Sequence, residues 1–266
     1  MNPLDPSKGE RYRSYREARH PLRERGRDLF LAGRFGKEIR LLVSDPRRVL
    51  VLGSADGKEV SALQSFFPQA LVVAMDLSEA EIEELESKES NLVLGDWNSP
   101  PFPPKSFDLA VFFAALHHAS SLDETFRSVA SILKPGGWVY ATHEPMASLI
   151  LGTSQRSRMK EIGKEVGGIE TSPRLREYRD SLRAAGFVDI RIEASGLNLV
   201  RLLEMGEGFE DTRARRSDWP ERLSRALAKL ARPFGEKKAL NLIFLIQRLT
   251  FGLFGVTLCG RKPHER

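Results

Sequence analysis

Short apolar runs recur along the chain, and each is bounded by residues that favour turns. Runs of β-branched and aliphatic residues between turn formers are typical of strands buried inside a sheet. The pattern therefore predicts seven strands. They occupy residues 49–52, 71–75, 91–95, 107–113, 138–143, 187–193 and 256–260.

Between several of these runs, apolar residues recur at helical spacing instead. Ser78 followed by acidic residues marks one helix start, because a serine can cap the first turn and carboxylates suit the helix dipole. Strands that alternate with helices predict an α/β fold. The predicted helical segments are 58–67, one beginning at Ser78, 122–133 and 172–185.

The same pattern divides the chain into four parts. Residues 1–47 form a basic helical segment, residues 48–195 the α/β core, residues 196–254 a basic and then apolar helical insertion, and residues 255–266 the final strand and tail. Residues 147–170 follow no clear pattern. We expect them to cover the substrate side of the core, with a mobile part marked by glycines.

Composition and charge narrow the possible partners. A chain of 266 residues with 41% hydrophobic residues can bury one large core, and the net charge of +5 raises the question of an anionic partner. Residues 213–254 are basic and then apolar, which suggests peripheral membrane contact, although a helical cap over the substrate pocket is the favoured interpretation. Nucleic acid is not expected, because few aromatic residues are interleaved with the basic stretches.

The single cysteine and the composition of the first residues of the chain indicate the cellular compartment in which the protein works. Cys259 cannot form an intrachain disulfide, and the chain opens with polar and charged residues rather than with the apolar run of a secretory signal. We therefore expect a cytoplasmic protein. No metal site is expected.

Candidate chemistry begins where the first strand ends. The loop of Gly53, Ser54, Ala55 and Gly57 leads from a strand into a helix, and its glycines allow backbone to approach a ligand. Asp76 ends the second strand roughly 20 residues later, the spacing at which an acidic residue accepts hydrogen bonds from ribose hydroxyls. The turn lacks the full glycine pattern of a nicotinamide dehydrogenase.

These motifs, in this order, resemble those of the class I methyltransferases that use S-adenosylmethionine, in their small-molecule (methyltransferase type 11-like) branch. The resemblance covers Arg48 to about Ser195 and again Gly255 to Pro263. It implies a Rossmann-like, seven-stranded, mostly parallel sheet with helices on both faces. It rests on the Gly53–Gly57 loop, Asp76, Asp96, Phe107-Asp108 leading to His117-His118, and Leu133-Lys134-Pro135-Gly136-Gly137.

The resemblance also implies roles for individual residues. The glycine loop would lie against the methionine part of S-adenosylmethionine, and Asp76 would hold the ribose. Asp96 would accept a hydrogen bond from the adenine amino group, with Trp97 or Leu77 against the ring. Phe113 and His117 are further expected cofactor contacts.

Two positions depart from the family pattern. Val51 stands where an acidic residue is usual, and Ala55 where a third glycine is usual. A noncatalytic protein that binds S-adenosylmethionine or a partner is therefore the alternative to an enzyme.

The favoured reaction is O-methylation of a small, hydroxylated or amphiphilic molecule. A hydroxyl acceptor needs a base, and histidine has the most suitable ordinary pKa. His118 and His143 are the candidates, because they follow the fourth and fifth strands; Glu144 is the next choice.

Overall fold

The computed structural model describes residues 21–54, 56–86, 91–166, 168–197, 200, 238, 241–242, 244–245, 248–249 and 255–265. Predictions for residues 1–20, and for most of the insertion 196–254, lie outside this range. Within it, no helix combines the length and apolar character needed to cross a membrane.

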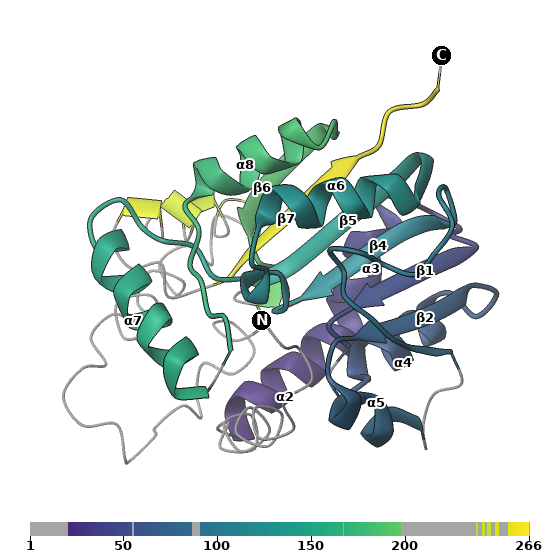
Figure 1. Ribbon diagram of the computed structural model, residues 1–266, viewed down its shortest axis with the longest axis horizontal. Helices are drawn as coiled ribbons and strands as arrows, with labels where there is room; N and C mark the ends of the chain where they lie inside the picture. Colours follow the sequence, from purple (N-terminus) through teal and green to yellow (C-terminus); the bar gives the residue numbers. More distant parts are fainter. Residues whose placement is uncertain are drawn as a thin grey trace.

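A seven-stranded sheet forms the centre of the molecule (Figure 1). The spatial order is β3-β2-β1-β4-β5-β7-β6, and every neighbouring pair is parallel except those that include β7. The mostly parallel, seven-stranded prediction is confirmed. The strands are β1 Arg48–Leu52, β2 Leu71–Asp76, β3 Leu92–Leu94, β4 Phe107–Phe113, β5 Leu133–Glu144, β6 Val188–Ala194 and β7 Val256–Arg261.

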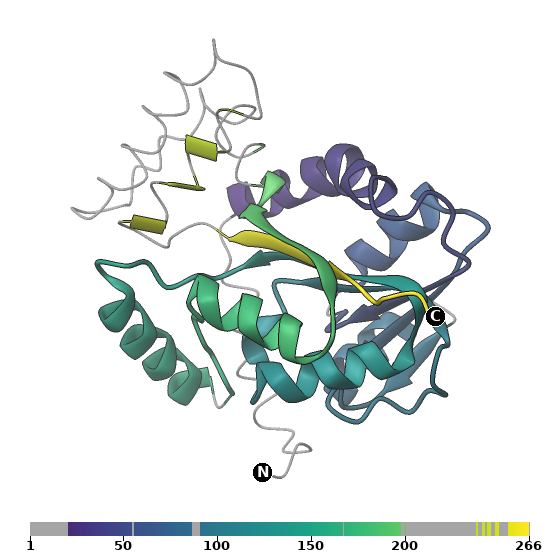
Figure 2. The same ribbon diagram turned by 90° about the horizontal axis from the view of Figure 1, so that it is seen from above.

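The central strands are apolar along their length because helices cover both of their faces. Figures 1 and 2 show α2 Pro21–Phe30, α3 Gly36–Arg40 and α4 Lys58–Phe66 on one face, with α6 Leu122–Ile132 and α8 Leu175–Ala184 on the other. A π-helical turn, Leu31–Phe35, joins α2 to α3. Two hydrophobic clusters result, one on each face. Phe30, Ile39, Val51 and Leu63 belong to the first, and Phe126, Val129, Tyr178 and Leu182 to the second.

Two segments differ from the prediction. Residues 133–137, which precede the predicted strand 138–143, are the first part of β5, in which Gly136 has a φ of +81°. Residues 147–170, expected only as a cover, contain a 15-residue helix, α7 Gly152–Val166. Its residues are largely exposed, and Met159 and Ile162 are only half-buried. It therefore lacks the apolar stripe that a well-packed helix shows in sequence.

The remaining helix, α5 Glu79–Glu86, follows β2, and the Ser78 hydroxyl accepts a hydrogen bond from the Glu81 N–H (3.4 Å). The predicted helix start at Ser78 is confirmed.

Candidate cofactor and acceptor site

The strand order reverses between β1 and β4, and open α/β sheets bind ligands at the carboxyl ends of strands beside such a reversal. The loops after these two strands touch. A Cβ added to Gly53 would lie 2.6 Å from Ala115 Cβ, and Gly53 has a φ of +73°. Ala114, directly after β4, also has a positive φ, +48°. Backbone strain at a non-glycine residue is characteristic of functional sites.

The loop after β1 fits a bound polar group. Ser54 is fully buried, and its Oγ has no hydrogen-bond partner among the residues described. A buried hydroxyl in this state is the kind of group that a ligand satisfies. Gly57, in the left-handed conformation, begins α4. Ala55 lies outside the described residues.

The ends of β2 and β3 lie beside this loop. Asp76 ends β2, and the Gly53 N–H donates to the neighbouring Met75 carbonyl (2.9 Å). Asp76 is half-buried, its Oδ1 accepts the Ser78 N–H (3.0 Å), and the half-buried Leu77 follows it.

After β3, Asp96 is exposed and its Oδ1 accepts the Asn98 N–H (2.8 Å). Trp97 is nearly buried, edge-on to Phe112 at 6.0 Å, and 3.4 Å from the Cβ position of Gly53. The expected cofactor residues that follow β1, β2 and β3 therefore lie together at the carboxyl ends of these strands. The unpartnered hydroxyl of Ser54 and the carboxylate of Asp76 fit a nucleoside cofactor there.

Helix α2 is tied to the same loop by Arg27, which is 7% exposed. Its guanidinium donates to both Asp56 oxygens (2.7 and 2.8 Å) and to both Glu59 oxygens (2.6 and 2.8 Å). It also lies over the Phe113 ring, 5.3 Å from the centroid. The sequence did not single out Arg27 among the many N-terminal arginines, because its burial follows only from the fold.

The pKa values of Asp56 and Glu59 are shifted in opposite directions, although Arg27 lowers both. Burial alone would raise the pKa of Asp56, but the charge and hydrogen bonds of Arg27 lower that pKa below its usual range. Burial raises the pKa of Glu59 above its usual range, in spite of Arg27.

A second buried carboxylate shapes the turn after β4. Glu144, at the end of β5, is fully buried. Its Oε1 accepts the N–H groups of Ala115 (2.9 Å) and Leu116 (3.0 Å), and its Oε2 accepts the His117 N–H (3.1 Å) and lies 3.0 Å from His117 Nδ1. The sequence proposed Glu144 as a base; the structure shows it as the residue that fixes this turn.

The predicted base His118 contacts the end of the segment 147–170, which was expected to cover the substrate side of the core. Its Nδ1 lies 2.9 Å from the Ile169 carbonyl oxygen and 3.5 Å from Glu170 Oε1. His117 Nε2 lies 3.4 Å from Glu170 Oε2, and the Glu170 side chain is 5% exposed. Glu170, like Arg27, was not predicted from the sequence, because it follows no motif.

The other predicted base, His143, has a φ of +61° and packs against Phe113, with 6.1 Å between the ring centroids. On its other side lies the backbone of Gly255, where a Cβ would be 2.7 Å from His143 Nδ1.

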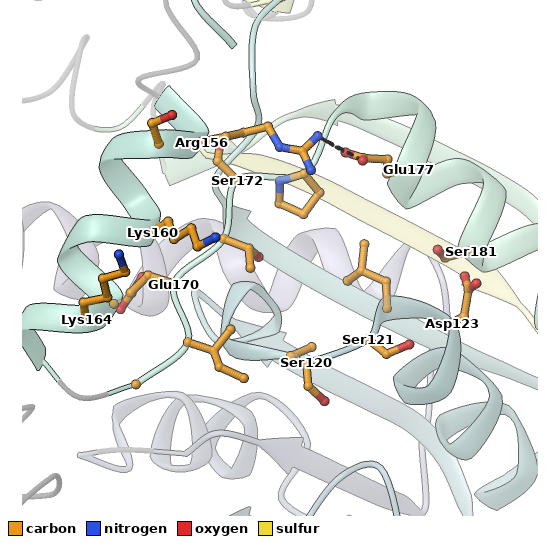
Figure 3. Close-up of a pocket in the computed structure, with 18 residues that line it drawn as sticks. Ser120, Ser121, Asp123, Arg156, Lys160, Lys164, Glu170, Ser172, Glu177 and Ser181 are labelled. Atoms are coloured by element: carbon orange, nitrogen blue, oxygen red, sulfur yellow. Dashed lines mark hydrogen bonds and ion pairs between the residues drawn. The ribbon is translucent and has the colours of Figure 1, made fainter. Parts of the chain in front are cut away.

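A cavity of about 730 Å³ opens beside the histidine pair. Figure 3 shows its walls: Ser120 and Ser121 at the start of α6, Arg156, Lys160 and Lys164 along α7, Glu170 and Ser172 in the following segment, and Glu177 and Ser181 on α8. Arg156 is paired with Glu177 at 3.0 Å. Lys160 and Lys164 have no ion pair with any described residue, so two uncompensated ammonium groups border the cavity.

Gly53→Ala tests the contact between the two loops. We expect a loss of roughly 1–3 kcal/mol of folding stability, since the new methyl group meets Ala115 and an alanine is strained at this φ. Chemical denaturation measures the change. Gly33→Ala is the matched control, because a Cβ at Gly33 meets nothing within 4 Å. Equal stability of the two variants would contradict the close contact.

Comparison with known proteins agrees with this geometry. Residues 50–141 match the family model described as "Methyltransferase domain". A malonyl-[acyl-carrier protein] O-methyltransferase of Methylococcus capsulatus is 30% identical over 167 residues, which cover 60% of this chain and 58% of that protein. A sterol 24-C-methyltransferase of Gibberella zeae is 32% identical over 110 residues, 41% of this chain and 28% of that protein. The chain thus spans less than two thirds of the length of these relatives.

Solved structures share the fold. A phosphoethanolamine N-methyltransferase of Haemonchus contortus, in complex with S-adenosyl-L-methionine, superposes with a TM-score of 0.54 at 18% identity, over 87% of this chain and 53% of that one. The [4+2]-cyclase SpnF superposes with a TM-score of 0.55, also at 18% identity, over 87% of this chain and 81% of that one. At this identity the likeness concerns the fold alone. The match at residues 50–141, the similarity to these methyltransferases and the strand order together support a class I, S-adenosylmethionine-dependent methyltransferase domain in this part of the chain.

Proposed function

We propose that the protein transfers the methyl group of S-adenosylmethionine to an oxygen of a small acceptor that carries an anionic group, most simply a carboxylate. The observation that carries this proposal is the cavity beside the histidine pair. Ile169 and Glu170 line it, and both contact His118, which follows β4 at the carboxyl edge of the sheet. An acceptor bound there lies next to the expected cofactor site.

The charges around the cavity favour an anion. Of the carboxylates that line it, Glu177 is paired with Arg156, and Glu170 lies against the histidines. Asp123 is in the first turn of α6, where it suits the helix dipole. Lys160 and Lys164 remain to attract an anionic acceptor. The similarity to a malonyl-[acyl-carrier protein] O-methyltransferase supports a carboxylate in particular.

Bound S-adenosylmethionine would supply an electrophilic methyl group, so the protein has mainly to hold and align the acceptor oxygen. The Gly53–Gly57 backbone and Asp76 would hold the cofactor, with Asp96 and Trp97 at its adenine end. A carboxylate acceptor is ionised at neutral pH and needs no base, whereas a hydroxyl acceptor would use the predicted base His118.

Transfer of labelled methyl groups tests the proposal. The protein is incubated with methyl-labelled S-adenosylmethionine and either malonyl- or acetyl-loaded acyl carrier protein, which differ by one carboxylate. We expect label in the malonyl sample as a base-labile methyl ester and none in the acetyl sample. Binding of S-adenosylmethionine without transfer to any anionic acceptor would instead favour the noncatalytic alternative. Preferential labelling of a sterol would contradict the anionic acceptor.

Lys160→Gln/Lys164→Gln tests the anionic contact. We expect the KM for the acceptor to rise roughly 10-fold, because each exposed charge pair contributes up to about 1 kcal/mol, while affinity for S-adenosylmethionine is unchanged. Arg158→Gln is the control, since Arg158 is exposed on the same helix and does not line the cavity. An unchanged KM in the double variant would show that Lys160 and Lys164 do not contribute to acceptor binding.

The cytoplasmic location and peripheral membrane contact through residues 213–254 remain predictions.

A further inference from the structure

The side chains of His117, His118 and Glu170 meet at one point beside the cavity. One ring nitrogen of each histidine and one carboxylate oxygen lie within 4.8 Å of one another. Two imidazoles and a carboxylate form a ligand set that first-row divalent metals favour, and catalytic zinc sites use it with a further position left open.

The distances suit a shared ion better than direct hydrogen bonds. His117 Nε2 lies 3.4 Å from Glu170 Oε2, beyond the range of about 2.7–3.2 Å in which N–H···O bonds are good. Two ligands that each lie about 2.0–2.2 Å from a tetrahedral ion are roughly 3.3–3.6 Å apart.

The hydrogen bonds of the two histidines determine which ring nitrogen carries the proton. The Ile169 carbonyl can only accept a hydrogen bond, so His118 Nδ1 carries the proton and Nε2 the lone pair. Glu144 already accepts three backbone N–H groups, and His117 Nδ1 donates to it in the same way, which leaves the lone pair on His117 Nε2. A ligating histidine almost always donates its other N–H to a carboxylate or a backbone carbonyl, and these two donate to one of each.

We propose that His117, His118 and Glu170 bind one divalent first-row cation, with Zn²⁺ the best match to the ligands. Glu170 lines the cavity, so an open coordination position would face the acceptor. The ion would then hold an acceptor oxygen and add to the positive charge of Lys160 and Lys164. This role in acceptor binding rests on the proposed function, but the ion site itself does not.

Direct metal binding to the full chain tests the site. The protein is stripped with a chelator and dialysed, and it is then titrated with Zn²⁺ by calorimetry and with Co²⁺ by visible absorption. We expect one ion per chain, and Co²⁺ bands of a nitrogen and oxygen site without the intense thiolate band that Cys259 would give. Absence of binding in both titrations would overturn the proposal.

Variants locate the ion. Glu170→Gln and His117→Gln should each weaken Zn²⁺ binding at least about 100-fold. Glu144→Gln, which replaces one acceptor oxygen of the carboxylate that orients His117 and its turn, should weaken it about 10-fold. His264→Gln is the control, because His264 lies beside Gly136, away from the cluster. Circular dichroism checks that each variant folds. Loss of binding in His264→Gln, or full binding in both ligand variants, would mean that the ion binds elsewhere.

The same preparations separate this inference from the proposed function. Methyl transfer without metal binding would reject the ion site and leave the proposed function intact. Metal binding without methyl transfer to any anionic acceptor would reject the proposed function and leave the ion site intact.

Discussion

Replacing Asp76 by Ala is expected to weaken S-adenosylmethionine binding on the order of 100-fold. Hydrogen bonds to a charged group contribute about 1.5–3 kcal/mol each, and a carboxylate at the end of β2 can accept from both ribose hydroxyls. Asp76 is half-buried beside the loop after β1, which is where a ribose would lie if the methionine part followed Gly53. Isothermal titration with S-adenosylmethionine and with S-adenosylhomocysteine measures the change, and both ligands should weaken equally because they share the ribose.

The controls for Asp76 separate binding from folding. Asp76 Oδ1 also accepts the Ser78 N–H, so its loss could disturb the start of α5. Asp76→Asn keeps an acceptor for that N–H but has no charge, and it should fall between the wild type and Asp76→Ala. Asp180→Ala removes a mostly exposed carboxylate from α8 and should change nothing. Unchanged affinity in Asp76→Ala would reject the ribose assignment.

The fold was largely predictable because its signals are local. The apolar runs of β1, β2 and β4 are continuous, since these strands are covered on both faces, and Gly53 and Asp76 lie directly at strand ends. The signals failed where burial was slight, as in α7, or where the chain continued a strand through glycines, as at Gly136.

The site was less predictable because its partners are distant in sequence. Arg27 and Glu59 are separated by 32 residues, and His117 and Glu144 by 27. No periodicity marks such pairs, since the first forms only when α2 packs against α4, and the second only when the turn after β4 meets the end of β5. The surroundings of Val51 also follow only from the fold. Val51 is buried on the face covered by α2 and α3, and the loop after β1 is held from that face by Arg27, through Asp56.

Arg27→Met should destabilise the fold by about 3–5 kcal/mol at neutral pH. Removing one partner of a buried ion pair leaves an uncompensated charge, and here Glu59 is 3% exposed and Asp56 only 20% exposed. Chemical denaturation followed by circular dichroism measures the difference. Because Asp56 belongs to the loop after β1, the variant should also bind S-adenosylmethionine more weakly under conditions where it remains folded.

The pH dependence of this difference identifies its cause. In the wild type the lowered pKa of Asp56 contributes stability above its unfolded pKa of about 3.9, and this stability is lost as the pH falls through the folded value. Without Arg27 both carboxylates take up protons more readily, so the difference in folding stability between variant and wild type should narrow as the pH falls.

Glu59→Gln added to Arg27→Met should recover part of the lost folding stability, because one of the two unpaired buried carboxylates is then uncharged. Arg34→Met breaks the half-exposed pair with Glu38 and should cost no more than about 1 kcal/mol. If Arg27→Met lowered the free energy of unfolding no more than Arg34→Met, the Arg27 guanidinium would not be what holds α2 against the loop after β1.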